Sequence, residues 1–323
     1  MTVTTISISL GSLIALLAAA SVAANLVVLY VIVAGGLLNK RQNSIYILST
    51  LNLVGDCAHA TFVLGYLAPS SIAQDWLVAS NYTEPGARVF AYCFQFCWYQ
   101  SELTQIAMTS NRLIAVLFPS YFDLFERKRV FVYCTGICVL AVLLSIFADE
   151  ILPCCSTFFY YGTYSYKFFG PANAFNYKNY FVDIPLNSAT SLYSLVCYGS
   201  IFATVYNANR TLKIGDQNMN RRKLTEVRYA AQFAAISLFF LAAWISFRIL
   251  PLVTPPNKPE WFVITLIFVL MHCTANAVVY MLMNKEIKRL LKLNFGFGCP
   301  SAKIVTISVS VATPTKSKIV EVK

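Results

Sequence analysis

The stretch Cys93–Pro119, CFQFCWYQSELTQIAMTSNRLIAVLFP, decides how the rest of the chain is interpreted. It is long enough to cross a bilayer as a helix, which takes about 20 residues. It also carries Glu102 in its middle and Asn111 and Arg112 near its end. A charged side chain in hydrocarbon is costly, so it usually faces the interior of a bundle and has a function. Alternatively, Arg112 extends its apolar stem and reaches the lipid headgroups. The stretch predicts the central helix of a membrane-spanning bundle.

Composition points to the same class of protein. Of 323 residues, 58% are hydrophobic and 12% are charged, whereas a soluble domain carries roughly 25% charged residues. The mean hydropathy is +0.62, and the apolar residues come in long blocks rather than in alternating or heptad patterns. We therefore expect an all-α, multi-pass integral membrane protein. The net charge of +11 comes from short basic loops, which favours membrane orientation over nucleic-acid binding.

Seven apolar blocks predict membrane-spanning helices. They lie at about 6–38, 44–67, 88–119, 130–152, 184–206, 229–252 and 261–283. The segment 285–295 follows, with apolar residues on one helical face and Lys and Arg on the other, which predicts an amphipathic helix on the membrane surface. We expect residues 1–295 to form a seven-helix bundle with this short eighth helix. The Ser-, Thr- and Lys-rich residues 296–323 are expected to be a disordered cytoplasmic tail.

The basic residues predict the orientation. With the N-terminus outside, all but five of the 25 Lys and Arg residues fall on the inner side, in agreement with the positive-inside rule. The exceptions are Arg88, Lys167, Lys178, Arg248 and Lys258. The sequon at Asn81 then falls outside, where N-glycosylation takes place. We expect a plasma-membrane protein with an extracellular N-terminus and a cytoplasmic C-terminus, the sensory cilium being a more specific alternative.

The polar residues inside the apolar blocks narrow the class further. A lone Asn25 stands in the first block and Asp56 in the second, five residues after Leu51. The third block ends in Asn111-Arg112, with Pro119 seven residues later, and the seventh contains Asn276-Ala277-Val278-Val279-Tyr280. In this order the chain resembles the rhodopsin-like G-protein-coupled receptors. Among these it is most similar to the nematode serpentine chemoreceptors, class x in particular.

The resemblance implies a chemosensory receptor. Such a protein binds a small environmental or pheromone-like ligand in the extracellular half of the bundle and activates a heterotrimeric G protein. The implied partners are that G protein, a small-molecule ligand and membrane lipid, and homo- or hetero-oligomers remain possible. The residues that match the family's G-protein switch are Asn111, Arg112, Tyr206, Glu226, Asn276 and Tyr280.

Further site residues follow from the same resemblance. Asn25, Asp56 and Asn276 would form a buried polar cluster, which either holds a sodium ion or waters or only packs the helices. The candidates for the ligand pocket are Glu102, Trp244 and Arg248. Trp244 would be the floor of the pocket or an ordinary core residue. Arg248 would attract an anionic ligand or reach the headgroups, and the headgroup interpretation is slightly favoured.

Cysteine chemistry is also implied. Cys93 near the start of the third helix is a candidate for a disulfide with Cys154 or Cys155, and Cys299 beyond the amphipathic helix is a candidate for palmitoylation. The alternative for Cys299 is an unmodified thiol. There is no CxxC pair with zinc-ligand spacing in the sequence, so we expect no metal site.

Other classes of protein are less well supported. The sequence contains no HExxH, GxSxG or P-loop motif, so we expect neither an enzyme nor a cofactor. No Lys lies between Glu260 and Lys285, which excludes a retinal Schiff base there and hence an opsin. A small-solute transporter or channel subunit would show inverted repeats and broken helices, which we do not find. A receptor fold that does not signal stays open, because Ala277 and Ser246 occupy positions where the family has proline.

Overall fold

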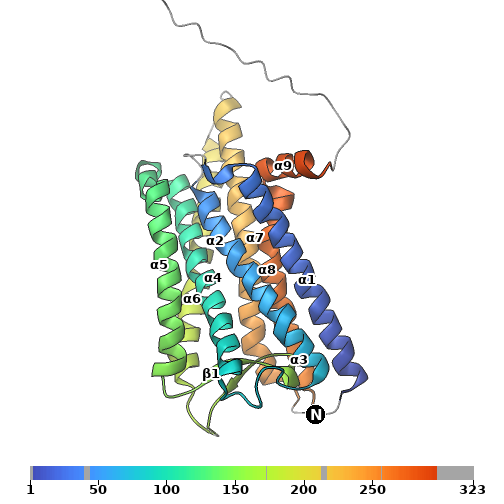
Figure 1. The fold of residues 1–323 in the computed structure, drawn as a ribbon. Helices are drawn as coiled ribbons and strands as arrows, with labels where there is room; N and C mark the ends of the chain where they lie inside the picture. Colours follow the sequence, from blue (N-terminus) through green and yellow to red (C-terminus); the bar gives the residue numbers. More distant parts are fainter. Residues whose placement is uncertain (1–2, 40–43, 172, 212–216, 256, 297–323) are drawn as a thin grey trace, which may run out of the picture.

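Seven long helices pack side by side into an upright bundle (Figure 1). This computed structural model describes residues 3–39, 44–171, 173–211, 217–255 and 257–296, and all structural statements below refer to these residues. Within the helices, the side chains of residues 205, 208–211, 217–230, 232 and 233 are not described.

The long helices follow the predicted apolar blocks closely. Their bounds are α1 Thr5–Ala34, α2 Ile45–Phe62, α4 Pro85–Leu117, α5 Arg127–Ile146, α6 Ile184–Thr211, α7 Gln217–Val253 and α8 Val263–Met283. Three π-helical turns extend them: η2 Val63–Leu67 joins α2 to α3 (Ala68–Ala73), η4 Phe147–Ile151 follows α5, and η6 Asn179–Asp183 precedes α6. Short 3₁₀ turns lie at Leu37–Asn39, Pro119–Phe125, Tyr161–Thr163 and Pro259–Phe262.

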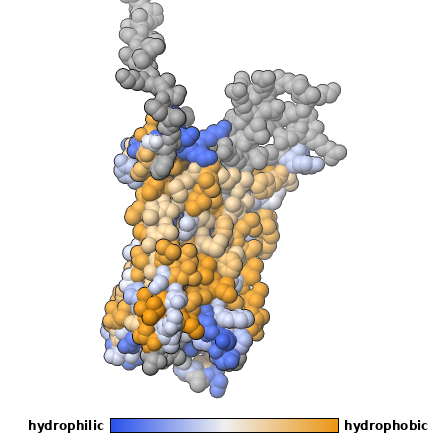
Figure 2. Space-filling model, turned by 90° about the vertical axis from the view of Figure 1, so that its right-hand side faces the viewer, coloured by the Kyte–Doolittle hydropathy of each residue, from blue (hydrophilic) through white to orange (hydrophobic). Residues whose placement is uncertain are grey.

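The bundle is built to lie in a membrane. Five described helical segments are long and apolar enough to cross one by composition alone: Thr5–Ala34, Ile45–Ala73, Arg127–Ile151, Ala234–Val253 and Pro259–Met283. Helices α4 and α6 run beside them over the same height (Figure 1). Both carry many polar side chains that are buried against other helices, which lowers their hydropathy without exposing them to lipid. Figure 2 shows apolar side chains over the sides of the bundle and polar ones gathered at its ends. The predicted seven-helix bundle is confirmed.

The two ends of the bundle differ. At one end, which we call the hairpin end, lie α3, the start of α1 and a two-stranded antiparallel sheet (Figure 1). Strand β1 (Ser156–Tyr160) pairs with β2 (Ser165–Phe169), with Ser156 opposite Phe169 and Tyr160 opposite Ser165. The segment that forms this hairpin, residues 156–169, is strongly aromatic. Its aromatic and Thr residues have high β propensity, and one face of the hairpin packs against the bundle.

At the opposite end, the α9 end, α9 (Lys285–Phe295) lies across the bundle (Figure 1). Asn284 caps it, because its Oδ1 accepts hydrogen bonds from the backbone N–H groups of Glu286 and Ile287 at 3.0 and 3.1 Å. Ile287 is fully buried, and the hydroxyl of Tyr46 in α2 donates to Glu286 at 3.0 Å. The predicted amphipathic eighth helix is therefore present and fixed to α2.

The two largest of the hydrophobic clusters among the described residues lie one toward each end of the bundle. The cluster at the α9 end includes Val28, Leu48 and Met108, and the cluster at the hairpin end includes Ile14 and Tyr66. In α2, α4 and α8 the residues between these clusters are largely polar and buried. The bundle therefore has a polar middle layer, and the candidate site residues lie in it or beside it.

Candidate functional site

Arg112 lies inside the bundle at the α9 end. Its side chain is 8% exposed, so the guanidinium does not extend to the surface as a purely topological arginine would. It is close enough to the phenols of Tyr198 on α6 and Tyr280 on α8 to interact with them electrostatically. The Tyr198 hydroxyl is 3.1 Å from the Thr109 hydroxyl on α4, and that of Tyr280 is 2.6 Å from the Ser49 hydroxyl on α2. Side chains from four helices thus meet at Arg112.

The other predicted switch residues are only partly brought together. Asn111 is buried beside Arg112. Tyr206 is 67% exposed on the outside of α6, so the structure does not place it near Arg112. Tyr198 takes that position, and sequence reasoning missed it although it lies on one helical face with Asn187 and Ser194. Glu226 belongs to α7, but its side chain lies outside the description.

The buried polar cluster has a different membership from the predicted one. Asp56 is 2% exposed and its Oδ2 accepts hydrogen bonds from the amides of Asn276 at 2.6 Å and Asn52 at 3.0 Å. The amide of Asn25 donates instead to the backbone carbonyls of Ser21 at 2.9 Å and Cys273 at 3.0 Å. Two of the three predicted members therefore touch, Asn25 binds the neighbouring turn of α8, and Asn52 was missed.

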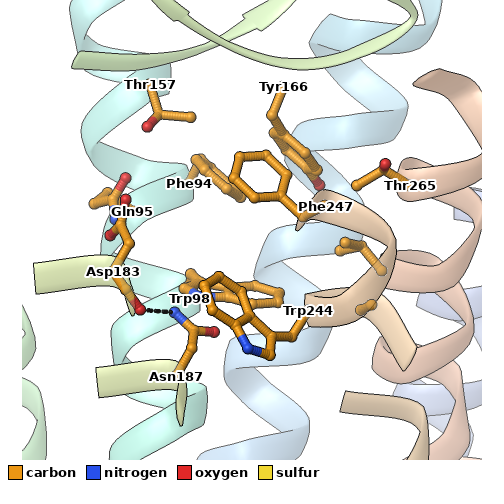
Figure 3. A pocket seen from close by; sticks show the side chains of 12 residues that line it. Phe94, Gln95, Trp98, Thr157, Tyr166, Asp183, Asn187, Trp244, Phe247 and Thr265 are labelled. Atoms are coloured by element: carbon orange, nitrogen blue, oxygen red, sulfur yellow. Dashed lines mark hydrogen bonds between the residues drawn. The ribbon is translucent and has the colours of Figure 1, made fainter. Parts of the chain in front are cut away.

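A cavity opens near the hairpin end between α4, α6, α7, α8 and the β-hairpin (Figure 3). Its lining consists of Phe94, Gln95, Trp98, Thr157, Tyr166, Asp183, Asn187, Ala243, Trp244, Phe247, Thr265 and Val269. The space open to the centre of a water-sized sphere is about 40 Å³, where a single water molecule takes about 10–15 Å³. In this conformation the cavity has room for a few waters or one small molecule.

Of the three predicted pocket residues, one lines the cavity. Trp244 contributes to its wall. Arg248 lies behind that wall, with its guanidinium 4.0 Å from the centroid of the Trp244 ring. Glu102 lies one helical turn beyond Trp98 and is fully buried. Its carboxylate has Trp98 of the same helix as a neighbour and accepts no hydrogen bond from another described helix.

The polar wall of the cavity comes from residues that sequence reasoning missed. Asp183 Oδ1 accepts a hydrogen bond from the Tyr99 hydroxyl at 2.8 Å, and the Asn187 amide donates to the Asp183 backbone carbonyl at 2.7 Å (Figure 3). Asp183 immediately precedes the predicted fifth block, and Asn187 and Ser194 continue its face of α6 at helical spacing. This helical spacing could have identified Asp183, Asn187 and Ser194 from the sequence.

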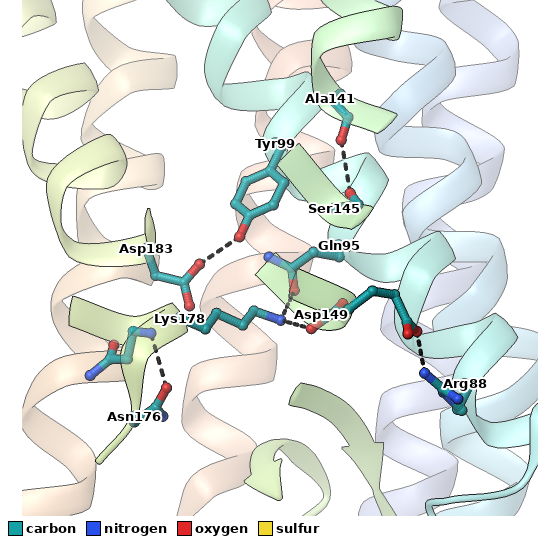
Figure 4. Close-up of polar contacts among 11 residues, drawn as sticks. Arg88, Gln95, Tyr99, Ala141, Ser145, Asp149, Asn176, Lys178 and Asp183 are labelled. Atoms are coloured by element: carbon teal, nitrogen blue, oxygen red, sulfur yellow. Dashed lines mark hydrogen bonds and ion pairs between the residues drawn. The ribbon is translucent and has the colours of Figure 1, made fainter. Parts of the chain in front are cut away.

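Beside this wall lies a buried ion pair (Figure 4). Lys178, which the charge count placed outside or near the outer leaflet, is 0% exposed. Its ammonium group donates to Asp149 at 2.5 Å and to Gln95 at 2.8 Å. The segment between β2 and α6 is thereby fastened to α4 and η4. A second pair at this end, Arg88 with Glu150, lies on the surface (Figure 4).

The β-hairpin supplies one wall of the cavity. Tyr166 of β2 stacks on Phe94 with ring centroids 4.2 Å apart, and its hydroxyl is 2.9 Å from His59 Nε2 on α2. Burial raises the pKa of Tyr166 well above its usual range, so the phenol stays protonated. His59 thus has a hydrogen-bonded packing role in this structure, and the hairpin is fixed to the bundle over the cavity.

The cysteines depart from expectation. Cys154 is bonded to its neighbour Cys155, and Cys93 is a free, partly buried thiol. The expected bridge from Cys93 is therefore not formed, because both candidate partner sulfurs are already used. Asn81 is exposed in the loop between α3 and α4, at the hairpin end, and its Oδ1 accepts hydrogen bonds from the backbone and hydroxyl of Thr83. Cys299 lies outside the described residues.

Seven packed helices, an eighth along one end and an arginine buried at that same end define a rhodopsin-type membrane receptor. The fold matches the crystal structure of squid rhodopsin with a TM-score of 0.72, covering 90% of this chain and 85% of that chain at 14% sequence identity. The family model for serpentine type 7TM GPCR chemoreceptor Srx matches residues 16–284. The chain belongs to this chemoreceptor family, as its sequence motifs predicted. No curated protein matches it.

Proposed function

We propose that this protein is a chemosensory receptor that binds a small ligand in the cavity and activates a heterotrimeric G protein at the α9 end. The observation that carries the proposal is a row of polar side-chain contacts between α4 and α6, leading from the cavity to Arg112. We call this row the α4–α6 polar interface. Its members are Tyr99, Gln105, Thr109 and Arg112 on α4, Asp183 on the turn η6 directly before α6, and Ser194 and Tyr198 on α6.

The α4–α6 polar interface has three hydrogen-bonded steps. At the cavity, the Tyr99 hydroxyl donates to Asp183 at 2.8 Å. In the middle, the Gln105 amide donates to Ser194 at 3.2 Å and also to Ser237 on α7 at 3.1 Å. Toward the α9 end, the hydroxyls of Thr109 and Tyr198 are 3.1 Å apart. The first and last steps lie beside the cavity and beside Arg112, so the interface joins the two sites.

Such an interface can respond to a ligand. Hydrogen bonds between side chains in a low-dielectric interior are strong but can exchange partners when one helix slides or rotates against another. A ligand that touches Asp183 and Asn187 bears directly on α6. If it binds one arrangement of α6 more tightly than the other, it shifts the population toward that arrangement. At the far end the same shift moves Tyr198 away from Arg112 and makes the guanidinium available to the G protein.

The proposed orientation places the α9 end in the cytoplasm. The exposed side chains of α9 include Lys285, Lys288, Arg289 and Lys292, and basic residues of this kind favour the cytoplasmic side and its anionic lipids. Asn81 and its sequon lie at the opposite end, where a glycan would be added. The ligand then enters from the extracellular side and the G protein binds from inside.

The test compares wild-type protein with Arg112→Ala in cells. We expect the substitution to abolish basal and ligand-evoked G-protein activation, recorded by energy transfer between labelled G-protein subunits. The matched control is Arg129→Ala, which removes an exposed arginine at the same end and should signal like wild type. An N-terminal epitope stained on intact cells normalises surface expression and checks the orientation. Equal signalling by Arg112→Ala at equal surface expression would contradict the proposal.

A further inference from the structure

We infer that the ligand of the cavity is a small organic ammonium ion, that is, an amine that is protonated at neutral pH. The inference rests on the proposed function, since it names the chemical class of the ligand for that same cavity. Two features of the described residues carry it: the aromatic lining and the acceptors on the polar wall.

The lining is rich in aromatic rings. Five of its members are aromatic: Phe94, Trp98, Tyr166, Trp244 and Phe247. Ring faces attract cations through their quadrupole, and the attraction grows when water is excluded. Trp244 already makes such a contact, because the Arg248 guanidinium is 4.0 Å from its ring centroid. An ammonium group in the cavity would meet the same chemistry on several sides.

The polar part of the lining includes hydrogen-bond acceptors beside the amide of Gln95 and the hydroxyls of Thr157 and Thr265. Asp183 lines the cavity, and one oxygen of its carboxylate accepts a hydrogen bond from the Tyr99 hydroxyl. Asn187 lines the cavity too, and its Oδ1 is buried without a hydrogen bond to any described residue. A buried acceptor without a partner is costly, and a ligand that donates hydrogen bonds removes that cost. Ammonium groups donate up to three, whereas a carboxylate ligand donates none and would be repelled by Asp183.

Arg248 is the one feature that would favour an anionic ligand. It does not line the cavity, because it lies on the other side of the Trp244 ring. Asp183 is the acidic group that interacts most strongly with Arg248. The protein itself therefore already offsets part of the charge of Arg248. The cavity itself therefore offers a carboxylate and ring faces, and no cationic side chain belongs to its lining.

The test uses ligands that share one body and differ only in the head group. The bodies are 3-methylbutyl, cyclohexyl and 2-phenylethyl, each offered as the amine, the alcohol and the carboxylic acid. Binding is measured by the ligand-dependent rise in unfolding temperature of the purified full-length receptor in detergent. We expect at least one amine to bind about tenfold or more tightly than its alcohol, from the added charge-assisted hydrogen bond and cation–π contacts, and the acids to be weakest.

Asp183→Asn tests the residue that makes the distinction. It is isosteric and can still accept from Tyr99, and the preference is read as a ratio within one protein, so a general loss of stability cancels. We expect the amine and alcohol to differ by less than about twofold in this variant once the charge is lost. The matched control is Asp75→Asn, an exposed aspartate at the same end, which should keep the wild-type preference.

Each outcome decides something different. Amine binding without G-protein activation supports the ligand class and counts against the coupling part of the proposed function. Tighter binding of an alcohol or an acid overturns the ammonium inference but leaves the cavity as the ligand site. The inference is also overturned if no amine binds, or if the amine preference survives Asp183→Asn.

Discussion

Two carboxylates are buried in the polar middle layer, and they differ in their hydrogen-bond partners. Asp56 accepts amide hydrogen bonds from Asn276 on α8 and Asn52 on its own helix. Glu102 is buried more completely, at 0% exposed, yet no other described helix donates a hydrogen bond to its carboxylate, whose neighbour is Trp98 on its own helix. A satisfied carboxylate holds helices together, whereas an unsatisfied buried polar group costs about 1–3 kcal/mol or more when charged. The Asp56 carboxylate therefore joins α2 to α8, whereas the Glu102 carboxylate joins α4 to no other described helix.

Asp149 is a third buried carboxylate, and removing its partner has the largest expected effect on stability. Asp149 has a cation, Lys178, as its partner. Lys178→Met leaves Asp149 buried and uncompensated, so we expect the free energy of unfolding to fall by about 3–5 kcal/mol. Chemical denaturation of the purified protein in mixed detergent measures it.

The matched control for this substitution is Lys258→Met, because Lys258 is 54% exposed in its pair with Glu260 and should cost less than about 1 kcal/mol. Adding Asp149→Leu to Lys178→Met should restore most of the loss, since a buried pair replaced by apolar residues is often neutral. If Lys178→Met is as mild as its control, the buried pair does not fasten the loop.

A smaller loss is expected at the Asp56 cluster. Asn276→Ala removes the 2.6 Å hydrogen bond to a carboxylate, and hydrogen bonds to charged groups contribute about 1.5–3 kcal/mol. We expect unfolding free energy to drop by that amount in the same denaturation assay. Asn257→Ala, at an exposed loop asparagine, serves as the control and should change stability by no more than about 0.5 kcal/mol.

Replacing a carboxylate by its amide makes the same chemical change at both sites. Asp56→Asn replaces an acceptor of two amide hydrogen bonds and should lower stability by about 1 kcal/mol. Glu102→Gln replaces a carboxylate that no other described helix hydrogen-bonds by a neutral isostere, and should raise stability by about 1 kcal/mol or leave it unchanged. The opposite sign is the result to look for. Two losses of equal size would show that Glu102 has partners in solution after all.

Much of the architecture could be predicted because the membrane constrains it. A helix needs about 20 residues to cross the hydrocarbon, so the apolar blocks predicted most helix bounds closely. The exception is α7, which begins at Gln217, well before its predicted block at 229–252. The pairing of Asp56 with Asn276 was also foreseeable, because two buried polar groups on neighbouring helices need partners. The amphipathic pattern after Asn284 was sufficient for α9. In each case a single physical requirement dominates the local sequence.

The features that were missed depend on how segments meet in space. The charge count placed Lys178 outside or near the outer leaflet, and nothing in its local sequence reveals that the loop folds inward to Asp149. Tyr206 was predicted and Tyr198 was missed, because a step of eight positions rotates the side chain by about 80° around the helix, enough to turn it outward. Likewise, the spacing of the cysteines in the sequence does not indicate that Cys154 bonds to Cys155 rather than to Cys93.

The β-hairpin has a consequence for the timing of the response. Tyr166 and Thr157 place the hairpin across the cavity, and the hydrogen bond from Tyr166 to His59 holds it there. A molecule cannot leave a site at the rate of free diffusion when a folded segment must first move aside. Exchange would then follow the opening rate of the hairpin, so the receptor would average the stimulus over that interval instead of following each fluctuation in its concentration.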